Sequence, residues 1–193
     1  MKNKLEELLR EDRMIPSVST VEQLKYAVER CSFSCIMLKM GDINTIGKMI
    51  AHIHKYEKSA MVHLDSIKGI SKDKSGIHYL RRIGVDSLIT MKSQNIRMIK
   101  EEGIHSVLGT FLVDSSSVAV TLQNMHTNKP DAVIAMPMTI PDSIYEILQE
   151  NTQIPIMAGG LGMSREIIDH VLGLGVRACA VTDKNILEQY EKI

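Results

Sequence analysis

Short apolar runs alternate with amphipathic segments from one end of this 193-residue chain to the other. The runs are almost continuously apolar, which is typical of parallel strands buried on both faces, whereas the segments between them show a helical period. Eight runs are present, at residues 15–18, 35–39, 60–65, 87–91, 106–112, 132–136, 156–158 and 178–182. The alternation predicts repeated strand–helix units and a parallel sheet.

Eight such units favour a closed (β/α)8 barrel of the TIM type, folded as a single domain over residues 1–193. A short, charged helix over residues 4–13 is predicted to precede it. Serines mark two helix starts, at Ser93 and Ser164, and glycines follow three helical runs, at Gly84, Gly103 and Gly175. An open, doubly wound sheet is the alternative, although no Gly-x-Gly-x-x-Gly follows the first run.

Composition excludes several classes of protein. Hydrophobic residues make up 44% and charged residues 24% of the chain, which is neither a disordered nor a membrane composition, and every apolar run is far shorter than a bilayer span. The N-terminus has no apolar segment typical of a secretory signal, so we expect a cytoplasmic protein that contacts no membrane. Its cysteines, Cys31, Cys35 and Cys179, lack metal-ligand spacing and are predicted to be reduced and structural.

A glycine turn follows the seventh run. Gly159 and Gly160 lack a Cβ, so their backbone can approach a phosphate closely, and the helix predicted to begin at Ser164 brings free N–H groups nearby. Thr182, at the end of the eighth run, adds a hydroxyl, as in the last quarter of many phosphate-binding barrels. An ordinary tight turn without a ligand is the alternative.

Charged and polar residues also end the earlier runs, where the functional face of a barrel lies. His63 and Asp65 are two residues apart, so we expect both side chains to face the barrel interior near its mouth. Lys92 lies just past the fourth run and Lys39 ends the second, so each can supply a cation to an anionic ligand. A solvated lysine is the alternative for Lys92 and the favoured interpretation for Lys39. No catalytic set, metal cluster or cofactor motif is evident.

A basic cluster stands out because the formal net charge of the whole chain is zero, which excludes nucleic-acid binding through bulk charge alone. The longest polar connection, residues 66–76, and the helix after it carry a predicted RNA-binding surface of five basic residues. They are Lys68, Lys72, Lys74, Arg81 and Arg82. Few aromatic residues lie nearby, so phosphate contact is predicted rather than base stacking, and a solvated charged surface is the alternative.

Several motifs resemble the glycerol-3-phosphate-responsive antiterminator regulators of glycerol uptake operons. They are Met-Val-His-Leu-Asp-Ser-Ile-Lys-Gly-Ile at 61–70, Phe-Leu-Val-Asp-Ser at 111–115, Met-Pro at 136–137, Ala-Gly-Gly-Leu at 158–161 and Tyr-Glu-Lys at 190–192. The resemblance covers nearly the whole chain. It implies a small TIM-type barrel, not an enzyme, that binds glycerol 3-phosphate and then leader mRNA, so that a terminator does not form.

The resemblance also implies a ligand phosphate at Gly159, Gly160 and Thr182, with His63, Asp65 and Lys92 facing the mouth. The chain departs from the family's usual pattern at several positions, where charged, polar or small residues are replaced. These are Ser19, Leu108, Gly109, Ile134, Met138 and the segment Val181-Thr182-Asp183. The departures leave fewer partners for a small polyol phosphate, so the identity of the ligand stays open.

Two other functions fit the same residues. One is an enzyme, such as an isomerase or aldolase of a small phosphorylated metabolite, with His63 and Asp65 as the acid–base pair. The other is a divergent paralogue whose ligand site has become an interaction surface. Neither the RNA target nor the oligomeric state follows from the sequence, and a homo-oligomer stays open.

Overall fold

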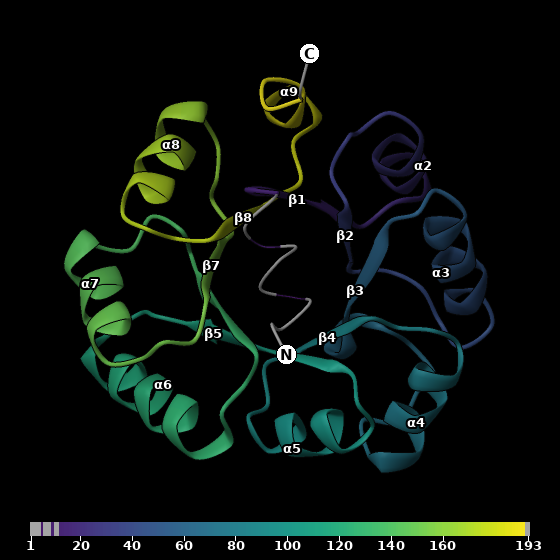
Figure 1. Cartoon of the computed structure of the whole chain (residues 1–193), viewed down its shortest axis with the longest axis horizontal. Helices are drawn as coiled ribbons and strands as arrows, with labels where there is room; N and C mark the ends of the chain where they lie inside the picture. Colours follow the sequence, from purple (N-terminus) through teal and green to yellow (C-terminus); the bar gives the residue numbers. More distant parts are fainter. Residues whose placement is uncertain (1–4, 6–8, 10–11, 192–193) are drawn as a thin grey trace.

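The chain folds into a closed (β/α)8 barrel (Figure 1). A computed structural model describes residues 5, 9 and 12–191. The parallel strands pair in sequence order, and the first strand also pairs with the last, which closes the ring and excludes the open sheet. The strands are β1 Met14–Val18, β2 Cys35–Leu38, β3 Ser59–His63, β4 Ser87–Thr90, β5 His105–Phe111, β6 Ala132–Met136, β7 Ile156–Gly159 and β8 Ala178–Val181.

Helices surround this ring, and the C-terminal helix lies between its neighbours α8 and α2 (Figure 1). The helices are α2 Val21–Glu29, α3 Ile46–Lys55, α4 Lys74–Arg82, α5 Gln94–Glu101, α6 Ser115–Asn128, α7 Asp142–Glu150, α8 Arg165–Gly173 and α9 Lys184–Glu188, with a 3-10 turn, η1, at Leu64–Ser66. Among the described residues, no helix is long and apolar enough to cross a bilayer.

The local signals at the helix ends are mostly confirmed. Ser164 caps α8 by accepting a hydrogen bond from the Ile167 N–H, and Gly84, Gly103 and Gly175 have the positive φ of a left-handed helix end. The prediction for Ser93 is wrong in detail, because its backbone is already helical and its side chain makes no capping bond. Helix α5 therefore begins without a side-chain cap.

Five of the predicted strands extend one or two residues beyond the carboxyl ends of the observed ones, and three of these concern predicted site residues. Strand β2 ends before Lys39, β3 ends at His63 and β8 ends before Thr182. The residues that follow each strand leave the sheet and enter the loops at the mouth of the barrel. The carboxyl-end positions that the sequence marked as functional are thus mostly loop positions just beyond the strands.

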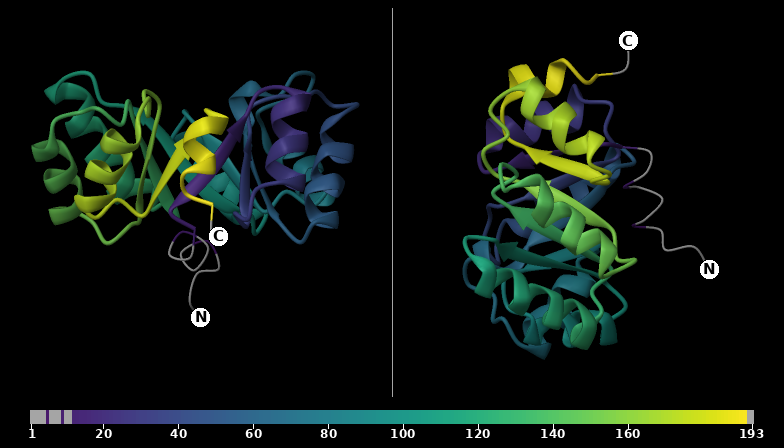
Figure 2. Two further views of the ribbon diagram at one scale, coloured as in Figure 1. Left: turned by 90° about the horizontal axis from the view of Figure 1, so that it is seen from above. Right: turned by 90° about the vertical axis from the view of Figure 1, so that its left-hand side faces the viewer.

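The barrel interior is one apolar cluster of side chains contributed by alternate strand positions. Leu5 and Leu9 belong to it and are 0% and 2% exposed. Both are helical, but most of the helix predicted over residues 4–13 lies outside the described residues. Seen from the side, the barrel is a short, wide cylinder ringed by helices (Figure 2).

A second layer of apolar packing lies between the strands and the helices. Cys31, Cys35 and Cys179 are all buried and free, as predicted, and burial raises the pKa of the Cys35 thiol to about 12. Such a thiol stays protonated and unreactive at neutral pH.

Candidate functional site

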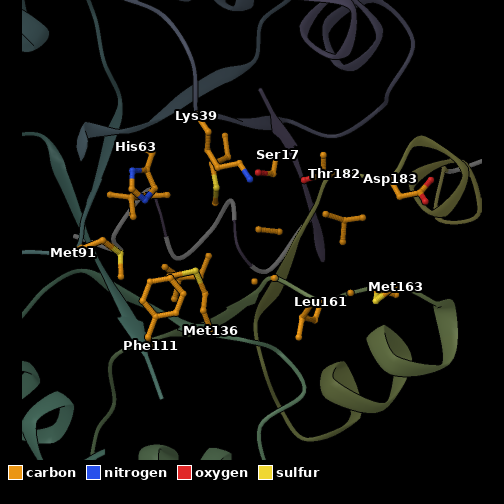
Figure 3. Close-up of a pocket in the computed structure, with 18 residues that line it drawn as sticks. Ser17, Lys39, His63, Met91, Phe111, Met136, Leu161, Met163, Thr182 and Asp183 are labelled. Atoms are coloured by element: carbon orange, nitrogen blue, oxygen red, sulfur yellow. The ribbon is translucent and has the colours of Figure 1, made fainter. Parts of the chain in front are cut away.

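A cavity of about 590 Å³ opens where the strands end (Figure 3). Its lining includes four of the six residues predicted to bind a ligand: His63, Gly159, Gly160 and Thr182. Lys39 lines it as well, although the sequence favoured a solvated lysine there. The cavity is large enough for a small organic ligand.

The glycine turn forms one edge of the cavity. Gly160 and Leu161 both have a left-handed backbone, with φ values of 74° and 58°, and Gly162 completes the turn. Within the described part of the chain, the backbone N–H groups of Leu161 and Gly162 have no hydrogen-bond acceptor. Free N–H groups beside a cavity can bind an anion.

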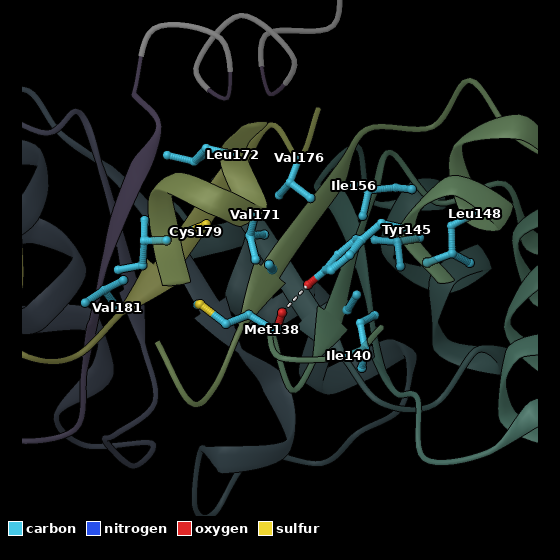
Figure 4. Packing of buried hydrophobic residues seen from close by; sticks show 14 of the residues in the cluster. Met138, Ile140, Tyr145, Leu148, Ile156, Val171, Leu172, Val176, Cys179 and Val181 are labelled. Atoms are coloured by element: carbon cyan, nitrogen blue, oxygen red, sulfur yellow. Dashed lines mark hydrogen bonds between the residues drawn. The ribbon is translucent and has the colours of Figure 1, made fainter. Parts of the chain in front are cut away.

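The turn is fixed from behind by Met138. The Met138 N–H donates to the Gly160 carbonyl at 3.0 Å, and the Tyr145 hydroxyl donates to the Met138 carbonyl at 2.9 Å (Figure 4). A Cβ on Gly162 would lie 2.7 Å from the Met138 Cε, so the buried methionine occupies the space of a side chain there. The turn is held in place before any ligand binds.

Lys39 lines the same cavity as the glycine turn. Figure 3 shows its amino group directed toward Ser17, on the side where Thr182 also lies. Burial lowers the pKa of Lys39. Among the described residues, no carboxylate forms an ion pair with its ammonium. A half-buried ammonium without an anionic partner is a strong attractor for an anion.

His63 lies at the end of β3 and also lines the cavity. Its Nδ1 is 3.1 Å from the Ser66 hydroxyl. Burial lowers the pKa of His63, and the nearby positive charge of Lys39 acts in the same direction, whereas Asp65 opposes it. The imidazole is therefore neutral at pH 7 and can donate or accept a hydrogen bond in the cavity.

The expectation that Asp65 shares a face with His63 is wrong. Strand β3 ends at His63, and Asp65 lies in the following 3-10 turn. Its carboxylate accepts hydrogen bonds from the Met91 N–H at 2.8 Å and the Thr90 hydroxyl at 3.3 Å, and it pairs with Lys72 at 3.6 Å. Asp65 ties the loop after β3 to the end of β4 and does not line the cavity.

Lys92 is exposed and is not among the residues that line the cavity either. It follows the end of β4, where its N–H donates to the Thr90 hydroxyl. Ser19 is exposed, and its N–H donates to the Gln23 side chain at 2.8 Å. Neither side chain belongs to the cavity, so the cation at this site is supplied by Lys39.

The remaining lining is largely apolar. Met91, Phe111, Ile134 and Met136 form one wall of the cavity, and Phe111 and Met136 lie across from Lys39 and Ser17 in Figure 3. Ile134 is one of the departures from the family's usual pattern. A Cβ on Gly159 would lie 2.9 Å from the Ile134 Cδ1, so this wall reaches the glycine turn itself.

The basic cluster is divided by the fold. Lys68, Lys72 and Lys74 are exposed near the mouth, where the Lys72 ammonium donates to the Asp65 carbonyl at 3.0 Å. Arg81 and Arg82 are exposed in the last turn of α4, about 12 Å farther along the helix axis, toward the opposite end of the barrel. The loop that carries Lys68 and Lys72 is anchored by hydrogen bonds between Lys68 and the loop after β2.

Proteins similar to this chain include one known from its sequence and two of known structure. An uncharacterized protein of Escherichia coli K12, YgcP, is 26% identical over 188 residues, which cover 96% of this chain and 97% of that protein. The structure of the glycerol uptake operon antiterminator regulatory protein of Listeria monocytogenes has a TM-score of 0.86 at 21% identity, covering 92% of this chain and 95% of that one. That of a glycerol uptake operon antiterminator-related protein of Thermotoga maritima has a TM-score of 0.82 at 20% identity, covering 92% and 98%.

The two structural similarities show the fold. The family assignment rests on the sequence, because the model of one family matches nearly all of the barrel, from β1 to the C-terminal helix. The match extends over residues 14–187, and the chain therefore belongs to the glycerol-3-phosphate responsive antiterminator family.

Proposed function

We propose that this protein is a metabolite-sensing antiterminator that binds a phosphorylated small molecule in the cavity and leader mRNA on its surface, in the cytoplasm. The observation that carries the ligand half is the position of Lys39. Its half-buried, unpaired ammonium and a turn with free N–H groups line the same cavity of about 590 Å³. Family membership supports the regulatory role.

The phosphate is assigned to the glycine turn. The N–H groups of Leu161 and Gly162 and the hydroxyl of Thr182 donate to its oxygens, and Lys39 supplies the charge. Gly159 and Gly160 allow the close approach, and neutral His63 orients the rest of the ligand. Asp65 and Lys92 act outside this contact.

Binding is tested by titration calorimetry of the full chain with inorganic phosphate and with glycerol 3-phosphate. Saturable binding with one ligand per chain is expected. The ligand should be recovered unchanged after incubation, because the acid–base pair expected of His63 and Asp65 is not assembled. Turnover of the phosphate ester would favour the enzyme instead.

RNA is assigned to the basic residues beside the mouth, Lys68, Lys72 and Lys74, with Arg81 and Arg82 able to extend the contact along α4. Phosphate contacts of this kind are electrostatic and depend on salt. A ligand bound in the cavity lies close to the loop that carries the lysines, which gives the metabolite a route to influence RNA binding.

The RNA half is tested by electrophoretic mobility of the leader RNA of the protein's own operon, with and without glycerol 3-phosphate. A shift that strengthens with the ligand is expected. The double variant Lys68→Ala/Lys74→Ala should weaken RNA binding. The slope of log affinity against log salt concentration should become shallower by about 1.4, because each phosphate contact on a single strand contributes about 0.7 to it. The control Lys25→Ala/Lys48→Ala removes two exposed lysines from α2 and α3.

The RNA proposal is wrong if micromolar protein leaves the RNA unshifted in both conditions. Equal weakening by the control pair would show a general charge effect instead of a binding surface at residues 68–74.

A further inference from the structure

The cavity has two chemically different sides. Polar groups cluster on one: Ser17, Lys39, Thr182, Asp183 and the N–H groups of the glycine turn. The other side carries Met91, Phe111, Ile134 and Met136, and the deeper residues Met37 and Ile89 continue it toward the barrel core. An anion bound by the polar side would point its substituent at a surface of carbon and sulfur.

The apolar character continues to the rim. Phe111, Leu161 and Met163 line the cavity and are 59%, 56% and 76% exposed. Large apolar side chains that cluster around one opening, instead of being scattered singly, mark a surface that buries an apolar group of a ligand or partner. They stand next to the turn that offers free N–H groups, so both kinds of contact are available to one molecule.

A polyol is poorly matched to this wall. Each hydroxyl that leaves water needs a new hydrogen-bond partner, and methionine, isoleucine and phenylalanine side chains supply no strong one. His63 is the polar side chain nearest to this region of the lining, and one of its ring nitrogens already faces Ser66. An alkyl or aryl group has no such requirement and gains from burial.

We infer that the preferred ligand is a phosphomonoester with an apolar alkyl or aryl substituent, whose phosphate occupies the glycine turn beside Lys39 and whose substituent covers the wall of Met91, Phe111, Ile134 and Met136. The inference rests on the anion site of the proposed function and specifies what that site accepts. The cavity of about 590 Å³ leaves room for the substituent.

The test is calorimetry of the full chain with inorganic phosphate, glycerol 3-phosphate, n-butyl phosphate, n-hexyl phosphate and phenyl phosphate, and with n-hexanol as the uncharged control. Affinity should rise about fourfold for each added methylene, hence about 15-fold from butyl to hexyl phosphate. Both hexyl and phenyl phosphate should bind more tightly than glycerol 3-phosphate, and the relative strength of the two distinguishes alkyl from aryl preference. Hexanol should bind far more weakly.

Two variants locate the substituent. Phe111→Ser removes a rim side chain that lines the cavity and should weaken hexyl phosphate binding about five- to tenfold, with inorganic phosphate unaffected. Val113→Ser is the matched control, because Val113 is 77% exposed, lies two residues farther along the chain, just beyond β5, and is absent from the lining. It should change neither affinity.

The outcomes separate the two proposals. Glycerol 3-phosphate binding as tightly as hexyl phosphate, or affinity independent of chain length, would overturn the apolar substituent and leave the anion site intact. No binding of inorganic phosphate or any ester would overturn the anion site and the inference together. Equal loss of inorganic phosphate binding in Phe111→Ser would also contradict the assigned orientation.

Discussion

One apolar cluster fills the barrel interior, but the interior is closed at the amino end of the strands and open at the carboxyl end. At the amino end of the strands, Leu5 and Leu9 are buried in the cluster together with Ile15 and Met61. At the carboxyl end the same cluster reaches Ile134 and then stops at an open cavity. One end is packed to the density of a protein core, and the other supports a site.

The difference arises in very few residues per strand. Lys39, His63 and Thr182 occupy the final strand position or the one after it, where the chain leaves the ladder. The positions just before Lys39 and His63 are Leu38 and Val62, which are buried and absent from the cavity lining. Packing and the candidate site are therefore separated along these two strands, and the wider separation between the two ends of the barrel can be tested from either end.

The largest effect is expected at the closed end. Leu9→Ala removes a side chain that is 2% exposed and should lower the free energy of unfolding by about 2–5 kcal/mol in urea denaturation. Phosphate-ester affinity should stay within twofold at temperatures where the variant is folded. Val113→Ala, on an exposed loop, is the control and should cost less than about 0.5 kcal/mol. A loss no larger than that of the control would contradict the packing of Leu9 in the core.

The next effect is expected at the open end, in binding. Lys39→Met should weaken the affinity for phosphate esters about 10- to 100-fold, because a charge-assisted hydrogen bond contributes about 1.5–3 kcal/mol. Lys92→Met should change it less than twofold, since Lys92 does not line the cavity. Calorimetry of the two variants side by side gives the comparison. The reverse ranking would restore Lys92 as the ligand's cation.

A smaller effect on stability is expected at the loop after β3. Asp65→Ala leaves the Met91 N–H without its acceptor and removes the ion pair with Lys72, so the free energy of unfolding should fall by about 1–3 kcal/mol. Asp65→Asn retains a carbonyl acceptor and should recover part of that loss. Ligand affinity should barely change in either variant. A binding defect without a stability defect would show that Asp65 contacts the ligand after all.

The smallest effect concerns pH and His63. Burial lowers the pKa of His63 in the folded protein below its ordinary value of 6.5, so the unfolded chain takes up the proton first as the pH falls. The contribution of His63 to stability is thus complete above about pH 6.5 and decreases as the pH drops toward the folded pKa. His63→Gln should reduce the slope of unfolding free energy against pH in this window. Identical slopes for the two proteins would contradict the burial effect.

Periodicity made the fold predictable, because a closed parallel barrel repeats one unit and each unit carries the same apolar signal. The glycine turn was also predictable, since Gly160 has the positive φ that glycine favours and the missing side chain of Gly162 leaves room for Met138. Both features depend on residues close together in sequence. The placement of Gly159, Gly160, Thr182 and His63 at one cavity follows from that repeat.

Predictions failed where one or two residues of strand length decide whether a side chain lines the cavity. Asp65 was expected on the strand, but β3 ends at His63 and the carboxylate turns toward β4. Lys39 is the first residue after β2, whereas Lys92 is the second residue after β4, and Met91 is the residue that lines the cavity there. The apolar wall needs the ends of three strands, β4, β5 and β6, to meet, so no local pattern signals it.

Closure of the ring has a consequence for recognition. Each of β1 to β8 is paired on both sides, so the described sheet presents no edge to which an extended segment of another chain could add. Any macromolecule that binds the described part of the chain must therefore contact side chains and loops instead of extending the sheet.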